Sequence, residues 1–226
     1  MEHSSDQAAP AGEDVSLSPP RGLFVGLTTL DLVQRVERAP GVNDKVGASR
    51  ADLASGGPAA NAAVTFRALG GHAVLLSALG SGPIARLAAD DLSRYGVSVL
   101  DCWSEGPNLS ISATTVLDGT GERSVVSRNA AGVGVRLPPH LDALVADVDV
   151  VLIDGHHPEL ALAAARCAQQ AETAVVLDCG SEKAVFTHLT PLAAAAVCSA
   201  EFTVAGAGGF DKVSAALLDT GTELVA

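Results

Sequence analysis

The stretch SGGPAANAAVTFRALGGHAVLLSALG, residues 55–80, decides how this chain folds. Its glycine pair, Gly56 and Gly57, stands directly before Pro58 and an alanine-rich segment. Proline is favoured in the first turn of a helix, and a glycine pair lets a backbone or a ligand approach closely because no Cβ is present. The stretch therefore predicts a tight turn, then a helix, then a strand.

Short apolar runs and helical segments alternate along the rest of the chain. The runs are rich in Val, Leu and Ile and are bounded by Gly, Asp or Ser, which is typical of buried strands. They are LFVGL (23–27), HAVLLSALG (72–80), VDVVLIDG (148–155), TAVVLDCG (173–180), AAAVCSAE (194–201) and TELVA (222–226). Helices are expected over 58–69, 83–95, 158–171 and 211–219, and the first three open with proline.

This alternation predicts an α/β fold with three layers, in which helices cover both faces of a parallel, Rossmann-like sheet. Two segments, about 44–57 and 110–129, instead alternate apolar and polar residues, and the second contains the turn DGTGE. They predict antiparallel strands with one solvated face, a small β-lid on the main sheet. The start of the chain is polar and proline-rich, so we expect a disordered tail over 1–20 and one domain over 21–226.

The charge and hydropathy of the chain exclude several classes of partner. Its 226 residues carry a formal net charge of −12 without any run of Lys or Arg, which leaves no basic surface for nucleic acid. No apolar run is long enough to span a bilayer, and the polar, acidic start does not read as a signal peptide. The four cysteines are scattered and form no C-x-x-C pair. We therefore expect a cytoplasmic protein that binds neither nucleic acid nor membrane and has reduced thiols.

The glycine pair and the asparagine that follows it suit a hydroxyl-rich ligand. Asn61 falls in the first turn of the expected helix, where its amide can both donate and accept hydrogen bonds. An ordinary strand-to-helix turn, with Asn61 bonded only to its own backbone, is the alternative. The stretch is neither a P-loop, which needs G-K-[ST], nor the G-x-G-x-x-G of a dinucleotide-binding fold. A dinucleotide-dependent enzyme is disfavoured for the same reason.

The motif GGPAAN (56–61), followed by glycines at positions 70 and 80, resembles the first signature of the ribokinase-like (PfkB) carbohydrate kinases. The order of the expected strands, lid and helices agrees with that family from about residue 23 onward. The resemblance implies a ribokinase-type sheet with a β-lid, and ATP-dependent phosphorylation of a sugar-like hydroxyl with Mg²⁺. Lids of this type often pair between subunits, so it also implies a possible homodimer through the β-lid.

The resemblance further implies which residues bind the acceptor, at the carboxyl ends of the strands beneath the lid. Asp31, four residues past the first strand, matches the aspartate that accepts hydrogen bonds from substrate hydroxyls; a solvated loop carboxylate is the alternative. Gly56, Gly57 and Asn61 match further substrate contacts.

Arg128 and Asn129 follow the second lid segment, where this family often contacts the acceptor. Arg128 would pair with a carboxylate, sulfonate or phosphate on the substrate, or else form a surface ion pair. Asp154 and Asp178 end strands at the same edge of the sheet, and Asp154 is expected to do no more than set up the turn before Pro158.

The sequence offers fewer candidate residues for binding phosphate and Mg²⁺ than for binding the acceptor. Glu201 falls at the glutamate of the family's Asn-x-x-Glu motif, although Cys198 stands in place of the asparagine. Lys183 would face phosphates or be a solvated lysine at a helix start. The adjacent His156 and His157 have no third ligand in view, so no protein metal site is expected there.

The family's second signature, Gly-Ala-Gly-Asp at a helix start, supplies the anion hole and the catalytic base, and it is not found. Gly206-Ala207-Gly208 is followed by Gly209, and Asp211 is displaced by two positions, as a helix cap would be. We therefore assign no catalytic residue and expect the C-terminal part of the fold to be missing and this chain to be inactive alone. A non-catalytic sugar-binding or regulatory module is the alternative.

Overall fold

The computed structural model of this protein describes residues 18–226. The tail predicted over residues 1–20 therefore falls, except for its last three residues, outside the described part of the chain. Residues 18–20 are exposed and lead directly into the first strand.

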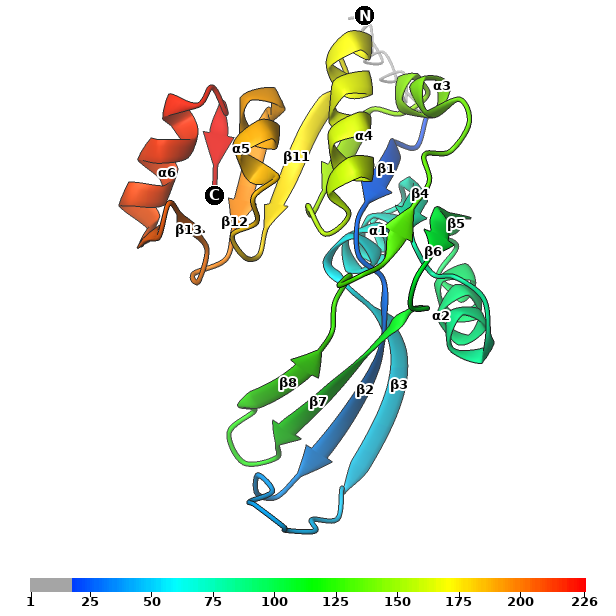
Figure 1. The fold of residues 1–226 in the computed structure, drawn as a ribbon, viewed down its shortest axis with the longest axis vertical. Helices are drawn as coiled ribbons and strands as arrows, with labels where there is room; N and C mark the ends of the chain where they lie inside the picture. The colour runs from blue at the N-terminus through cyan, green and yellow to red at the C-terminus, as the bar shows by residue number, and fades with distance from the viewer. Residues whose placement is uncertain (1–17) are drawn as a thin grey trace, which may run out of the picture.

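A seven-stranded sheet forms the centre of the molecule, and all its pairings are parallel (Figure 1). The strand order is β15-β12-β11-β10-β1-β4-β5. The strands are β1 (Arg21–Val25), β4 (His72–Ser77), β5 (Ser98–Asp101), β10 (Val150–Ile153), β11 (Ala174–Cys179), β12 (Ala195–Cys198) and β15 (Leu224–Val225). All six predicted apolar runs are confirmed as strands of this sheet, and β5 is an additional strand at its edge.

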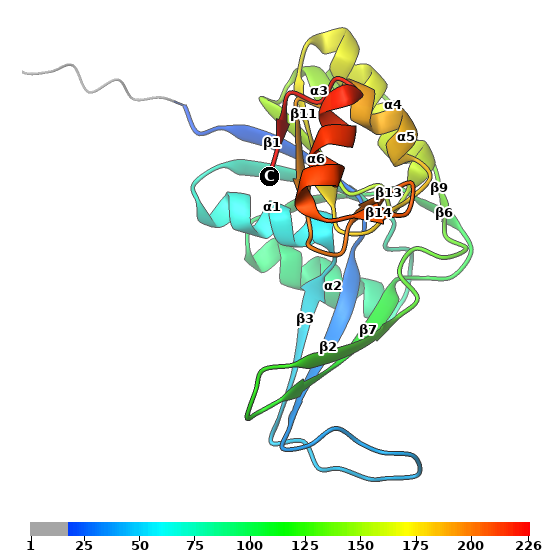
Figure 2. The same cartoon turned by 90° about the vertical axis from the view of Figure 1, so that its left-hand side faces the viewer.

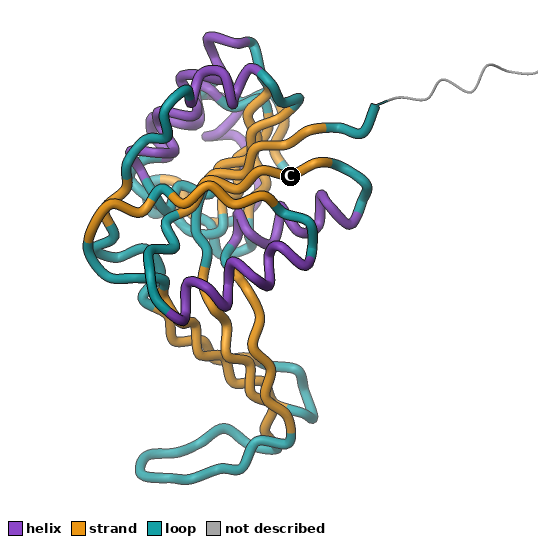
Figure 3. Tube along the Cα trace, turned by 90° about the vertical axis from the view of Figure 1, so that its right-hand side faces the viewer, coloured by secondary structure: helices purple, strands orange, loops and turns teal. Residues whose placement is uncertain are grey.

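Helices cover both faces of the sheet, so the three-layer α/β prediction is confirmed (Figure 3). They are α1 (Pro58–Ala68), α2 (Pro83–Arg94), α3 (Leu141–Ala146), α4 (Pro158–Ala171), α5 (Phe186–Leu189), a 3₁₀ turn (Thr190–Leu192) and α6 (Phe210–Asp219). The predicted helices over 58–69, 83–95, 158–171 and 211–219 correspond to α1, α2, α4 and α6. Among residues 18–226, no helix combines the length and the apolar character that crossing a bilayer requires.

Alternate residues of the strands build a separate core on each face of the sheet. Leu23 and Val151 pack toward α3 and α4 on one face. Phe24 and Leu75 pack toward α1 on the other face. Because successive side chains of a strand point to opposite faces, a strand buried on both sides reads as a continuous apolar run. This is the pattern that predicted the sheet.

The lid is a four-stranded sheet in the order β3-β2-β7-β8, and it projects away from the main sheet (Figures 1 and 2). Its strands are β2 (Thr29–Val36), β3 (Arg50–Gly56), β7 (Ser110–Leu117) and β8 (Arg123–Ser127). The β2–β3 and β7–β8 pairs are antiparallel, whereas the central β2–β7 pair is parallel. The sequence predicted lid strands over 44–57 and 110–129. The structure adds β2, which that prediction did not include, and places residues 44–49 in the loop at the lid tip rather than in a strand.

Two smaller antiparallel pairs complete the fold. Strand β6 (Trp103–Glu105) pairs with β9 (Gly134–Val135) close to where the lid joins the main body. Strand β13 (Thr203–Val204) pairs with β14 (Ala207–Gly208) in a hairpin directly before α6. The Gly206-Ala207-Gly208 sequence thus belongs to a hairpin, whose turn has positive φ at Ala205 and Gly206.

Leu177 tests the packing of the central sheet. Its side chain in β11 is fully buried, so Leu177→Ala should lower the free energy of unfolding by about 2–5 kcal/mol, measured by urea denaturation. Leu69, whose side chain is 82% exposed after α1, is the control, and its replacement by Ala should change stability by about 0.5 kcal/mol or less. Equal losses in the two variants would contradict the core described here.

Candidate functional site

A cleft of about 400 Å³ lies between the lid and the carboxyl ends of the main-sheet strands. Lid strands β2, β7 and β8 line one side, and the start of α1 lines another. The turns after β10 and β11 form the rest of the wall. The structure brings together eight of the residues singled out in the sequence: Asp31, Gly57, Asn61, Asn129, Asp154, His156, Asp178 and Lys183.

Asp154 is the buried anchor of this cleft. Its Oδ2 atom accepts hydrogen bonds from the backbone N–H of Leu27 at 2.8 Å and of Ala59 at 3.1 Å. Its Oδ1 atom accepts another from the backbone N–H of His156 at 2.9 Å. The carboxylate thus joins the end of β1, the first turn of α1 and the turn after β10, which is more than the turn-forming role expected from the sequence. Burial raises the pKa of the Asp154 carboxyl, against the opposing effect of the three N–H donors.

The glycine pair serves the packing around Asp31. Asp31 lies in strand β2, not in a loop, and its Oδ1 atom accepts a hydrogen bond from Thr29 Oγ1 at 2.6 Å. A Cβ on Gly56 would overlap the Asp31 carboxylate. Gly57 has a φ of 98°, which L side chains rarely adopt, and a Cβ there would overlap the carbonyl oxygen of Leu27. Gly57 lines the cleft, whereas Gly56 acts by leaving room for Asp31.

Asn61 and Asn129 face the cleft from opposite sides. Asn61 lies in the first turn of α1, and its side-chain amide makes no hydrogen bond to another residue of the described chain. Asn129 follows β8 with a φ of 52°, and its backbone N–H donates to Ser127 Oγ at 3.1 Å. The Asn129 side-chain amide, like that of Asn61, has no hydrogen-bond partner among residues 18–226, so both amides are available to a ligand.

Arg128 does not line the cleft. Its guanidinium donates to the backbone carbonyl of Asn108 at 2.8 Å. The arginine of β8 that lines the cleft is Arg123, which the sequence analysis missed. The signal that would have found it is the two-residue period of a strand, since Arg123, Val125 and Ser127 share one face of β8.

A second group of charged side chains lies beyond the ends of β10 and β11. Burial lowers the pKa of Lys183, while Asp154 and Asp178 oppose that shift. The Lys183 ammonium donates to the backbone carbonyl and hydroxyl oxygens of Ser181, each at 3.2 Å. Burial also raises the pKa of Asp178, as does the charge of Asp154. The cleft therefore contains a cation held close to two partly or fully buried carboxyl groups.

His156 is a cleft residue that the sequence analysis weighed only as a metal ligand. Burial, with a contribution from Lys183, lowers its pKa to about 4. The imidazole is therefore neutral at neutral pH and can donate one hydrogen bond and accept another. Among residues 18–226, no group of three or more His, Cys, Asp or Glu side chains is arranged to hold a metal ion.

The other residues singled out in the sequence lie outside the cleft wall. Glu201 is exposed in the turn between β12 and β13. Asp211 lies in the first turn of α6. Cys198 stands opposite Cys179 in the pairing of β12 with β11, and both are free thiols.

A family model and a curated relative both show that this chain is similar to carbohydrate kinases. The model of the pfkB family carbohydrate kinases matches residues 21–208. An ATP-dependent ribose-1-phosphate kinase of Halopiger xanaduensis is 28% identical over 211 residues, which cover 91% of this chain and 66% of that protein. This chain therefore spans a little less than two thirds of the length of that relative.

Solved structures of ribokinases have a fold similar to that of this chain. A putative ribokinase from Agrobacterium tumefaciens is 26% identical with a TM-score of 0.71, over 81% of this chain and 60% of that one. The ribokinase of Giardia lamblia is 17% identical with a TM-score of 0.72, over 92% of this chain and 68% of that one. Arabidopsis thaliana ribokinase, solved with ribose and ATP, is also 17% identical, with a TM-score of 0.66 over 92% of this chain and 70% of that one.

The lowered pKa of His156 has a measurable consequence for stability. An unfolded histidine gains a proton near pH 6.5, whereas the folded His156 does so only near pH 4. Between these values the unfolded chain binds more protons, so the free energy of unfolding falls as the pH is lowered. In His156→Gln this fall should be shallower in urea titrations from pH 6.5 to pH 4.

The control for this measurement is His188→Gln, at an exposed position in the last turn of α5. Because this side chain is exposed, the substitution should change the free energy of unfolding at neutral pH by about 0.5 kcal/mol or less. A His156→Gln profile parallel to that of the unmodified protein would disprove the assigned shift.

Proposed function

This chain belongs to the pfkB family of carbohydrate kinases, and from that premise we propose that its cleft binds the acceptor of an ATP-dependent phosphoryl transfer. The acceptor is a sugar or a sugar-like molecule, one of whose hydroxyl groups receives the γ-phosphoryl group. The observation that carries the proposal is the convergence of Asp31, Asn61 and Asn129 on one cleft beneath the lid.

The chemistry of the cleft wall suits a polyhydroxylated ligand. A carboxylate such as Asp31 accepts hydrogen bonds from hydroxyl groups, and each amide can donate and accept. The hydroxyls of Ser112, Thr114 and Ser127 add further polar groups on the lid side. A wall with few apolar side chains and many short polar ones binds sugar hydroxyls better than it binds a flat hydrophobic ring.

ATP is the donor that we propose, with Mg²⁺. Lys183 is the cation on the main-sheet side of the cleft, and we propose that it neutralises phosphate charge. Mg²⁺ bound to nucleotides is typically held by phosphate oxygens and one or two carboxylates. Glu201, exposed in the turn after β12, is the carboxylate that we propose for it. These residues fit the charge of the donor, and no general base is assigned among the residues of the cleft wall.

A non-catalytic sugar-binding or regulatory module is a second candidate. The observation in its favour is that the Gly-Ala-Gly sequence lies in the β13–β14 hairpin and that Asp211 does not line the cleft. Incubation with ATP, Mg²⁺ and a sugar panel separates the two candidates. Sugar binding with phosphorylated product supports a kinase, and sugar binding without product supports the module.

Asp31 tests the assignment of the acceptor cleft. Hydrogen bonds to charged groups contribute about 1.5–3 kcal/mol, so Asp31→Asn should weaken sugar binding roughly 10- to 100-fold. Calorimetric titration with ribose and a panel of pentoses and hexoses measures this effect. Asp52→Asn is the matched control, because Asp52 lies on the same face of the lid but is paired with Arg50. Unchanged affinity in Asp31→Asn would refute the proposal, as would failure of the protein to bind any member of this panel once sugar phosphates and sugar acids are added to it.

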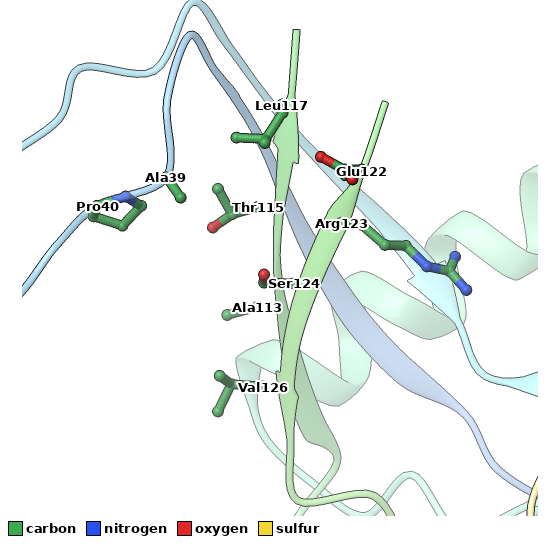
Figure 4. Close-up of a pocket in the computed structure, with 9 residues that line it drawn as sticks. All are labelled: Ala39, Pro40, Ala113, Thr115, Leu117, Glu122, Arg123, Ser124 and Val126. Carbon is green, nitrogen blue, oxygen red and sulfur yellow. The ribbon is translucent and has the colours of Figure 1, made fainter. Parts of the chain in front are cut away.

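We also propose that the outer face of the lid, opposite the cleft, is a homodimer contact. Leu53, Ile111 and Val126 are exposed on this face. Next to them lies a hollow of about 690 Å³, lined in part by Ala113, Thr115 and Leu117 (Figure 4). Exposed apolar side chains gathered on one sheet face are a feature of protein contact surfaces.

Two neighbouring valines of β8 test this contact. Val126 is 77% exposed on the outer face, and Val125 is 50% exposed on the cleft face. Val126→Glu should shift the protein toward the monomer in sedimentation velocity, because a carboxylate would be buried in the contact. Val125→Glu should leave the dimer intact. A protein that is monomeric before any substitution, or equal effects of the two changes, would rule the contact out.

A further inference from the structure

The position of Arg123 distinguishes it from the other polar residues of the cleft. In the β7–β8 pairing Arg123 stands opposite Val116, and Ser127 stands opposite Ser112. Ser112 is also the register partner of Asp31 in β2. Arg123 therefore lies on the cleft face, four positions further toward the lid tip than Asp31. Arg123 also borders the outer hollow, but Figure 4 shows its side chain extending to the opposite side of β8 from those of Thr115 and Val126.

Among residues 18–226, Arg123 has no partner for its guanidinium, unlike the other arginines of the lid. Each of those binds a carboxylate or a backbone carbonyl: Arg35 with Asp118, Arg38 with Asp44, Arg50 with Asp52, and Arg128 with Asn108. Within the described chain, Arg123 forms neither an ion pair nor a side-chain hydrogen bond. Among residues 18–226, Arg123 is thus the one arginine of the lid whose guanidinium is available to a ligand.

The spacing separates two ends of the cleft. Four residues of strand correspond to about 13 Å, so Asp31 and Arg123 cannot bind the same substituent of a small ligand. The end near Asp31 and Asn61 offers groups for hydroxyls. The end near Arg123 offers a planar fork of N–H donors, which fits a carboxylate or phosphate with two parallel hydrogen bonds. A chain with a net charge of −12 does not attract anions by its overall field, so a bound anion depends on local groups such as this one.

We propose that Arg123 binds an anionic group of the acceptor, at the end of the molecule away from the hydroxyls that meet Asp31. The preferred acceptor is then a sugar phosphate or a sugar acid rather than a neutral sugar. This inference rests on the proposed function of the same cleft.

Calorimetric titration with ribose, ribose 1-phosphate, ribose 5-phosphate and ribonate tests the inference. The two phosphates place the anion at opposite ends of the ring, and ribonate replaces phosphate by carboxylate. At least one anionic ligand should bind roughly tenfold or more tightly than ribose, and its affinity should fall as NaCl is raised. In Arg123→Gln that ligand should lose this advantage, while the affinity for ribose stays the same.

Arg50→Gln is the matched control, since Arg50 lies on the same face of the lid but is paired with Asp52. It should leave both affinities unchanged. Ribose binding as tightly as every anionic ligand would overturn the inference and leave the acceptor cleft standing. A parallel loss for ribose and the anionic ligand in Arg123→Gln would also overturn it, because Arg123 would then only support the lid. Failure of all four ligands to bind would instead refute the proposed function.

Discussion

The carboxylate of Asp154 is the interaction on which the cleft depends. It accepts three backbone hydrogen bonds from segments that are far apart in the chain: the end of β1, the first turn of α1 and the turn after β10. A buried carboxylate without such donors would be costly, and backbone N–H groups at a helix start lack partners within the helix. The backbone N–H groups therefore satisfy the buried carboxylate, and the carboxylate supplies the acceptors that these N–H groups lack. Gly26 is part of the arrangement, because a Cβ there would overlap the Asp154 carboxylate.

The same region joins the lid to the main body. Strand β2 follows β1 after three residues, and strand β3 runs back from the lid tip directly into the Gly56-Gly57 turn. Asp31 fits beside that turn only because position 56 has no side chain. The sugar-binding aspartate that we propose and the turn before α1 are therefore fixed by one set of contacts. A substitution that disturbs the turn also moves the carboxylate.

Much of this fold could be predicted from the sequence, and the exceptions have physical reasons. The two-sided burial of strands such as β10 and β11 gives continuous apolar runs, and proline marks the starts of α1, α2 and α4. Strand β5 was missed because it lies at the edge and is largely exposed. Strand β2 was missed because TLDLVQRV mixes buried, half-buried and exposed positions without a regular alternation.

For the site, the motif at 56–61 located the cleft, but tertiary contacts decided which side chains face it. The role of Asp154 depends on three segments that only the folded chain brings together. The choice of Arg123 over Arg128 depends on which face of β8 meets the cleft, and sequence order alone does not fix that face. The β2–β7 pairing adds one more consequence. Both strands run from the main body outward, so all four lid strands are attached to the main body at the same end of the lid, which is the end near Asp31. A rotation of the lid about that end would carry Arg123 through a longer arc than Asp31, because Arg123 lies four register positions further toward the lid tip.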